Sequence, residues 1–381
     1  MGNLKNLDLL LEKYVNDTMI AGAGLRVYRG SDCLYDRCLG YADAEEKKAF
    51  RPDTICQLAS MTKCIAVAAG MQLYERGAFL LTDPVEKFIP EFADRKVYYA
   101  DERGIIGTRP AKSPVTVGQL FDMTSGISVG WETPTFNGKE MSEGTQKLIA
   151  EGRYTVQEYA KLCGRVPGNF DPGEHFYYGD SHNIIGALIE VITGQTFGEF
   201  MKENIFDPLG MPDTFFKVPA EKKDRLAVIY SLEGERRERS GLPAFFFSED
   251  FESACGGLYS TLEDYTRFAR CMTLGEWNGV RLLSNRTISL MAQNRLCPAA
   301  LREFRSPDLA GYGYGLGVRT HMEAAGGFTS SVGEFGWSGA WGAWVLMDPA
   351  AEITIVHLHN SRPSLGNEIH PRILEIVYSA I

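Results

Sequence analysis

A serine and a lysine stand three positions apart at the start of a helical pattern, as Ser60-Met61-Thr62-Lys63. At this spacing the hydroxyl and the amine share one helical face, with Cβ atoms about 5 to 6 Å apart, so they can hydrogen-bond. Free backbone N–H groups and the positive end of the helix dipole favour an anionic oxygen at Ser60. One turn of helix therefore supplies a nucleophile and its activator, which is the chemistry of covalent acyl transfer.

The helix that carries this pair is apolar on nearly all sides. Residues 60–76, SMTKCIAVAAGMQLYER, form the strongest helical pattern of the chain, and the pattern closes at Gly77. The plain alternative is a serine that caps the helix and a lysine that points into water. A lysine beside CIAVAAGMQL has little access to a solvated surface. We therefore expect Lys63 to be buried, and desolvation to lower its pKa toward the neutral, proton-accepting form.

Other hydrolase patterns are weaker. Residues 126–130 read Gly-Ile-Ser-Val-Gly, but a nucleophile elbow needs a strand before Ser128 and a helix after it, and neither is indicated. A Ser-His-Asp triad needs a placed histidine, and we expect His182 on a helix surface. His357 and His359 share a strand face, where packing is favoured over a metal pair. The candidates are His175, His182, His321, His357, His359 and His370.

Composition narrows the class of partner. The chain has 381 residues, with 39 Lys plus Arg against 49 Asp plus Glu and a net charge of -10. An acidic surface disfavours nucleic acid and anionic membranes, so we expect a small-molecule partner. The sequence contains no phosphate loop, dinucleotide fingerprint or EF-hand loop, and we expect no cofactor and no metal. The first residues read as an amphipathic helix and not as a secretory signal, which favours the cytoplasm.

The elements around the pair indicate an α/β (α+β) fold. A β-hairpin is expected around the turn at residues 29–32, and Gly-rich alternating strands are expected from 311 to 360. Between them the strand signal is scarce, and KVYYADERGIIGTRPAKSP and WETPTFNGKEMSEG read as long loops, with EGERRERSG as an exposed turn. We expect helices over residues 182–193, 261–274, 284–295 and 367–380.

Strands at both ends that flank a helical middle predict one antiparallel sheet built from two sequence-distant pieces. We expect a discontinuous sheet subdomain of residues 1–83 and 251–381 and a mostly helical subdomain of residues 84–250. The active site is expected in the cleft between them.

Six segments together resemble the serine β-lactamase and penicillin-binding-protein-like superfamily, in its class C-type branch and closest to family VIII carboxylesterases. Nearly the whole chain is covered, in the family's order. The segments are ICQLASMTK, LLTDPVEKFIPEF, VTVGQLFDMTSGI, FDPGEHFYYGDSHNIIGALIE, CGGLYSTLEDYTRFARCM with NGVRLLS, and GWSGAWGAWVLMDP.

The resemblance implies a role for each matching residue. Ser60 would be the acyl-accepting nucleophile and Lys63 its proton relay. Tyr178 would stand at the tyrosine of the family's Y-x-N motif, with Tyr177 one position away as the alternative. A phenol held against an ammonium can serve as a base for Ser60 and for the deacylating water. Asp180 replaces the usual asparagine of this motif, and a carboxylate cannot donate an amide hydrogen bond to a substrate.

The family's third element appears as Trp337-Ser338-Gly339 where Lys-Thr-Gly or His-x-Gly is usual. The resemblance implies that these residues and Asp180 bind substrate. An indole suits an uncharged ester better than a carboxylate, as in family VIII esterases. The backbone N–H groups of Ser60 and Ala340 would form the oxyanion hole.

We therefore expect a serine carboxylesterase that cleaves small-molecule esters through an acyl-enzyme on Ser60. Alternatives are β-lactamase or D-amino-acid peptidase activity, acyl transfer to an acceptor other than water, or an inactive ligand-binding relative. The natural substrate and the oligomeric state stay open. Aromatic residues expected near an apolar acyl pocket are Trp131, Phe136, Phe245, Phe246, Phe247 and Trp341.

Overall fold

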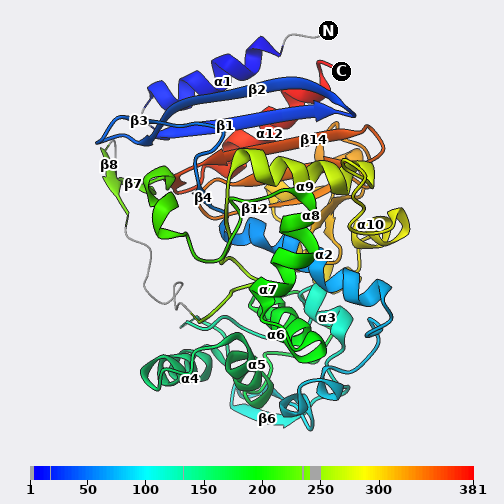
Figure 1. Ribbon diagram of the computed structural model, residues 1–381. Helices are drawn as coiled ribbons and strands as arrows, with labels where there is room; N and C mark the ends of the chain where they lie inside the picture. The colour runs from blue at the N-terminus through cyan, green and yellow to red at the C-terminus, as the bar shows by residue number, and fades with distance from the viewer. Residues whose placement is uncertain (1–3, 18, 132, 234–235, 241–249) are drawn as a thin grey trace.

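The computed structural model describes residues 4–17, 19–131, 133–233, 236–240 and 250–381. Its centre is an antiparallel sheet of eight strands in the order β10-β11-β12-β13-β14-β1-β2-β3 (Figure 1). Strands from the two ends of the chain meet where β14 pairs with β1. The strands are β1 Gly22–Arg29, β2 Asp32–Asp43, β3 Lys48–Ala49, β10 Tyr312–Tyr314, β11 Arg319–His321, β12 Phe335–Ser338, β13 Trp344–Asp348 and β14 Ile353–His359.

Both faces of this sheet are covered by helices, which explains why its central strands are apolar throughout. On one face, Leu346 and Ile355 pack with residues of α1 (Lys5–Asn16) and α12 (Gly366–Tyr378), and Figure 1 shows these helices near the two termini. On the other face, the neighbouring residues Val345 and Val356 pack in one core with α9 (Leu262–Leu274) and α2 (Thr62–Glu75). The alternation follows the period of two along a strand.

The inserted middle of the chain is mostly helical, as expected. Its longest helices include α6, which ends at Gly194 with a φ of +73°. Glycine adopts this left-handed conformation without the steric cost of a Cβ, so it closes the helix. The helices are α3 Val117–Phe121, α4 Gly138–Ala150, α5 Val156–Arg165, α6 Ser181–Thr193, α7 Phe197–Met201 and α8 Asp207–Leu209, followed by α10 Asn285–Met291 and α11 Pro298–Phe304.

Several local expectations are wrong. The first expected loop forms a hairpin of β5 (Lys96–Ala100) and β6 (Ile106–Pro110). Both strands are largely exposed, so they lack the apolar alternation that marks a half-buried strand. The second expected loop contains the start of α4, whose first residue is Gly138. Helix α10 is shorter than expected because it ends at Met291.

The charged segment EGERRERSG belongs to a further hairpin. β7 (Tyr230–Glu233) pairs with β8 (Arg236–Arg239), and β7 also runs parallel to β15 (Ser361–Arg362). Residues 236–239 of the expected turn are therefore strand, and residues 234, 235 and 241 lie outside the described residues. The subdomain boundaries at 84 and 250 stay a prediction. Two short strands, β4 (Cys56–Gln57) and β9 (Tyr259–Ser260), pair beside the start of α2.

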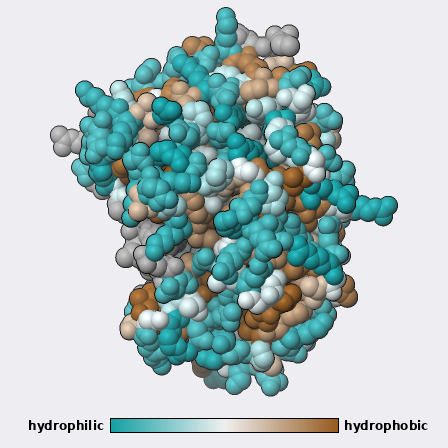
Figure 2. Space-filling model, in the orientation of Figure 1, coloured by the Kyte–Doolittle hydropathy of each residue, from teal (hydrophilic) through white to brown (hydrophobic). Residues whose placement is uncertain are grey.

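Figure 2 shows that hydrophilic residues dominate one face of the molecule, with hydrophobic residues exposed in separate patches. Among the described residues, no single helix has the length and apolar character needed to cross a membrane. Ser181–Thr193 with Phe197–Leu209 passes that test only as a pair bent by 83°, on length and composition alone.

Candidate active site

Ser60 lies in a single 3-10 turn, Ala59–Met61, between the short strand β4 and helix α2. The preceding residue, Ala59, has a φ of +46°, which is the left-handed region that an alanine rarely adopts. Such backbone strain costs about 1–3 kcal/mol and persists where the surrounding structure imposes it. Here the N–H of Leu58 bonds to the carbonyl of Leu258 at 2.9 Å, which anchors the turn to the segment before β9.

Lys63 is buried, as expected, and points at Ser60. Its Nζ donates to Ser60 Oγ at 3.2 Å and to the carbonyl oxygen of Cys255 at 2.6 Å. The same Nζ lies 4.7 Å from the ring centroid of Tyr178. The ammonium is thus held by three neighbours from three separate parts of the chain.

The expected neutral form of Lys63 is wrong. Burial alone would lower the pKa of the ammonium, but the negative charges that Tyr178, Cys255 and Asp180 can carry outweigh it and raise that pKa above its ordinary value. The raised pKa favours the ammonium form of Lys63, which can hold a proton and stabilise negative charge beside Ser60.

Of the two candidate tyrosines, Tyr178 is the one at the site, and its role as the base stays a prediction. Tyr178 lines the same cavity as Ser60, whereas Tyr177 is absent from the described lining. The following Gly179 allows the close approach, because a Cβ there would lie 2.2 Å from the carbonyl oxygen of Ile127. The phenol is about a third exposed, at 38%.

Trp337, at the end of β12, contacts the phenol. Its indole Nε1 donates a hydrogen bond of 2.8 Å to the Tyr178 Oη, and the two ring centroids lie 5.3 Å apart. The edge of the Trp337 ring also meets Tyr314 at a centroid distance of 5.2 Å. Tyr178 therefore faces an ammonium over its ring and an N–H donor at its oxygen, and both stabilise negative charge on it.

Gly339 brings the end of β12 against the turn that carries Ser60. A Cβ at Gly339 would lie 2.1 Å from the carbonyl oxygen of Leu58, so no larger residue fits there. The Gly339 N–H bonds to the carbonyl of Ala343 at 2.7 Å. The next N–H, that of Ala340, has no acceptor among the described residues, and Ala340 lines the cavity beside Ser60. The Ala340 N–H can therefore donate a hydrogen bond to an oxyanion.

Asp180 serves a different contact from the one expected. Its Oδ2 accepts from the hydroxyl of Tyr159 at 2.6 Å and from the N–H of Gly130 at 3.1 Å. No hydrogen bond joins it to Lys63 within the described part of the chain. Burial raises the pKa of the Asp180 carboxyl, while Tyr159, Lys63 and Gly130 oppose that rise. Asp180 ties the start of α6 to the loop around Gly130.

The cavity beside Ser60 has a volume of about 250 Å³ and a mainly apolar wall. Of the four residues expected to bind substrate, Asp180 lines it, whereas Trp337, Ser338 and Gly339 do not. Ser338 instead lines a separate hollow on the far side of its strand. The lining residues are Gln57, Ala59, Ser60, Lys63, Val129, Gly130, Trp131, Tyr154, Tyr178, Gly179, Asp180, Asn183, Phe251, Ser253, Cys255, Gly256, Ala340 and Trp341.

Trp131 and Trp341 form part of this wall, as expected, and Phe136 does not. Phe245, Phe246 and Phe247 lie outside the described residues.

Sequence reasoning missed the segment that closes the cavity on the side of α6. Asn183 accepts hydrogen bonds from the Cys255 N–H at 3.1 Å and from the Ser253 hydroxyl at 3.0 Å, which fixes the carbonyl that Lys63 meets. Phe251 and Tyr154 complete the wall. The sequence carries no signal for these contacts, because they join residues about 70 to 100 positions apart through ordinary polar and aromatic side chains.

The alternative nucleophile Ser128 is buried in a hydroxyl cluster. Its Oγ lies 3.2 Å from the hydroxyls of both Thr133 and Thr135. The segment around it has no strand before and no helix directly after among the described residues, so the nucleophile-elbow geometry is missing.

The histidines do not supply a base for Ser60. His182 is fully buried and not on a helix surface as expected, and its Nε2 lies 3.1 Å from the carbonyl of Phe121. Burial, with the Lys63 charge, lowers the pKa of His182 to about 3. His357 and His359 hydrogen-bond to each other at 2.9 Å within the sheet. No group of three or more His, Cys, Asp or Glu among the described residues is arranged to hold a metal ion.

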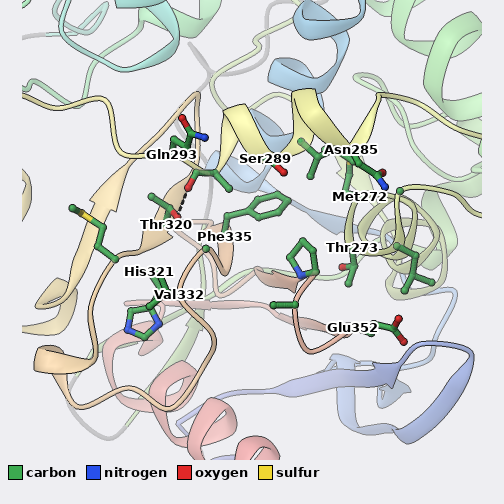
Figure 3. A pocket seen from close by; sticks show the side chains of 18 of the residues that line it. Met272, Thr273, Asn285, Ser289, Gln293, Thr320, His321, Val332, Phe335 and Glu352 are labelled. Atoms are coloured by element: carbon green, nitrogen blue, oxygen red, sulfur yellow. Dashed lines mark hydrogen bonds between the residues drawn. The ribbon is translucent and has the colours of Figure 1, made fainter.

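A second, larger cavity of about 630 Å³ lies between α9, α10 and β11 (Figure 3). Its Thr320 hydroxyl bonds to the Ala292 carbonyl at 2.6 Å. It contains Ser289 and His321, but both ring nitrogens of His321 meet backbone carbonyls, at 3.0 and 3.1 Å. His321 is therefore held by backbone carbonyls, and no hydrogen bond joins it to Ser289 among the described residues.

With the geometry in place, comparison with known proteins decides the family. The Beta-lactamase family model matches residues 7–378. The chain belongs to this family. It is 28% identical to esterase EstB of Burkholderia gladioli over 374 residues, which cover 93% of this chain and 90% of EstB. It is also 28% identical to acyltransferase mokF of Monascus pilosus over 307 residues, 77% of this chain and 71% of mokF.

The structure of simvastatin synthase (LovD) from Aspergillus terreus, unliganded, aligns with a TM-score of 0.84 at 22% identity and covers 98% of this chain and 97% of LovD. This likeness confirms the expected fold. Together with the family match, it confirms the resemblance to the β-lactamase-like superfamily. Within this family, the two named relatives are an esterase and an acyltransferase.

Proposed function

We propose that the protein is a carboxylesterase that hydrolyses small, uncharged esters through an acyl-enzyme on Ser60. One observation carries the proposal. Ser60, Lys63 and Tyr178 line one mainly apolar cavity, where the buried ammonium of Lys63 contacts both the Ser60 hydroxyl and the Tyr178 ring. Lys63 is the one cation in the described lining, and it is engaged by Ser60 and Cys255. No free cation there can pair with a substrate carboxylate.

In the acylation step, Tyr178 takes the hydroxyl proton of Ser60 while the Ser60 Oγ bonds to the ester carbonyl carbon. The ammonium of Lys63 over the ring and the N–H of Trp337 at the oxygen would stabilise negative charge on Tyr178. The carbonyl oxygen becomes an oxyanion, to which the N–H groups of Ser60 and Ala340 donate hydrogen bonds. The bond to the alcohol then breaks, and Tyr178 returns its proton to the alcohol oxygen.

Water completes the cycle by the reverse route. Tyr178 takes a proton from the water as the water oxygen bonds to the acyl carbon. The ester bond to Ser60 breaks, the carboxylic acid leaves, and the proton returns to the Ser60 oxygen. The ester and the water are thereby converted into an acid and an alcohol, and the protein is restored.

Acyl transfer to an alcohol or amine is the second candidate, supported by the similarity to acyltransferase mokF. The same acyl-enzyme serves both reactions, so the difference lies in the acceptor. A β-lactamase or peptidase is less well supported, because Trp337 replaces the usual cation and Asp180 binds Tyr159 and Gly130. An inactive relative is disfavoured by the intact contacts among Ser60, Lys63 and Tyr178.

The test is a substrate panel of p-nitrophenyl esters, a chromogenic cephalosporin and D-Ala-D-Ala peptides, with and without an added alcohol acceptor. We expect turnover of the esters by the wild type and none by Ser60→Ala, while Ser128→Ala retains activity. Faster cephalosporin or peptide turnover than ester turnover would contradict the proposal. Transfer to the added alcohol in preference to hydrolysis would replace it with the acyltransferase function.

A further inference from the structure

The segment from Phe251 to Gly257 runs between two cavities. On one side lies the cavity of Ser60, with a volume of about 250 Å³, lined by Ser253, Cys255 and Gly256 of this segment. On the other side lies a cavity of about 790 Å³, lined by Glu252 and Gly257. Phe251 lines both cavities. A single side chain thus stands where the small cavity could continue into one about three times its volume.

The ring of Phe251 is held in place by two tyrosines. It stacks on Tyr154 with a centroid distance of 4.2 Å and an interplanar angle of 6°. It meets Tyr159 edge to face at 5.5 Å and 86°. The Tyr159 hydroxyl is in turn fixed by its bond to Asp180. With 7% of its surface exposed, Phe251 is a packed wall between the cavities and not a mobile gate.

The cavity beyond Phe251 can accept hydrocarbon. Its lining combines several large apolar side chains with the charged residues Glu199, Lys202, Asp207, Lys217, Lys223 and Glu252. The carboxylate of Glu252, the residue next to Phe251, is engaged by the Gly198 N–H at 2.6 Å. An alkyl chain that passed the position of Phe251 would therefore meet apolar surface and no free charge on that carboxylate. The apolar residues are Phe206, Met211, Phe215, Phe216, Val218 and Leu226.

We infer that Phe251 is the specificity-determining residue that sets the upper limit on acyl-chain length. The inference rests on the proposed function, since it takes the cavity beside Ser60 as the acyl pocket. Short and medium acyl chains fill this cavity and end against the Phe251 ring. Longer chains are excluded because the ring blocks the way into the larger cavity.

The experiment compares wild type, Phe251→Ala and Phe216→Ala with p-nitrophenyl esters of acyl chains from acetyl to palmitoyl. Phe216 is the matched control, because it lines the second cavity alone. We expect the wild-type kcat/KM to fall about tenfold or more from the medium to the long chains, a typical discrimination by a closed pocket. Phe251→Ala should flatten this fall, and Phe216→Ala should keep it.

Phe251→Leu is the second variant, because it retains packing against Tyr154 if the alanine variant fails to fold. It should move the optimum to longer chains by a smaller step. An unchanged chain-length profile in a folded Phe251 variant would overturn the inference, as would equal turnover of short and long chains by the wild type. A second series of acetate esters with alcohols of increasing length identifies which group enters the cavity. A Phe251→Ala effect confined to that series would also overturn it.

The two proposals fail differently. If the wild type hydrolyses no ester at all, the proposed function fails. If the wild type hydrolyses short esters through Ser60 but Phe251 variants keep its chain-length profile, only the inference about Phe251 fails.

Discussion

The hydrogen bond from Trp337 to Tyr178 gives a sharp test of the proposed base. Phe at position 337 keeps an aromatic ring against Tyr178 and Tyr314 but removes the donor of the 2.8 Å bond. A hydrogen bond to a charged group is worth about 1.5–3 kcal/mol. This bond lies at the exposed side of the site, where water screens it, so we take the lower end. A loss of about 1.5 kcal/mol corresponds to about a tenfold fall in rate.

The assay is steady-state hydrolysis of p-nitrophenyl butyrate, with kcat and KM determined separately. Since the indole contacts the base and does not line the cavity, Trp337→Phe should lower kcat and leave KM nearly unchanged. Trp341→Phe is the matched control. Trp341 lines the same cavity, and its buried Nε1 has no hydrogen-bond partner among the described residues. This variant makes the same chemical change without removing a hydrogen bond to those residues, and its kcat should stay within about twofold of wild type.

Equal effects of the two tryptophan variants would refute the reasoning, because the rate would then not depend on the donor to Tyr178. A rise in KM with unchanged kcat for Trp337→Phe would also refute it. That result would place the indole on the substrate, which is the role expected from the sequence.

Three further predictions concern the turn, an ion pair and the buried lysine. Gly339→Ala should lower kcat/KM by about 100-fold with the fold retained by circular dichroism, because its Cβ would displace the Leu58 carbonyl beside the nucleophile. Asp171, bonded to Arg109 at 3.0 Å, has its carboxyl pKa held below the ordinary value, chiefly by that guanidinium. Asp171→Asn should therefore cost about 1–2 kcal/mol in urea unfolding at pH 7, and the difference should shrink as the pH falls below about 4. Because the pKa of Lys63 is raised, deprotonation of this lysine should not lower kcat/KM until the pH exceeds about 10. A fall in kcat/KM below pH 9 that depends on the lysine would contradict its charged state.

The local part of the site could be predicted from the sequence. The spacing of Ser60 and Lys63 fixes their contact within one helical turn, since both lie on the same face. A single sheet built from the two ends of the chain, and the helices α2, α6 and α9, also follow from apolar periodicity and glycine stops, whereas the number and order of the strands do not.

The non-local part could not be predicted. The pKa of Lys63 depends on Tyr178, Cys255 and Asp180, which the fold brings to it from distant positions, so burial alone gave the wrong direction of shift. The bond between Trp337 and Tyr178 joins residues 159 positions apart.

The same limit applies to a residue that lines the cavity and to an exposed hairpin. Phe251 has no sequence signal that separates it from an ordinary core residue. The hairpin of β5 and β6 is largely exposed, with Val97 as its one fully buried residue, and so carries no apolar period. In each case the information lies in which surfaces meet and not in the local pattern.

The most direct test of the central claim is the site of covalent acylation. The wild-type protein is reacted with a fluorophosphonate and digested, and the modified residue is identified by mass spectrometry. We predict one adduct per chain, on Ser60, that is lost in Ser60→Ala and strongly slowed in Tyr178→Phe. Modification of Ser128, or full labelling and ester turnover in Ser60→Ala, would contradict the account.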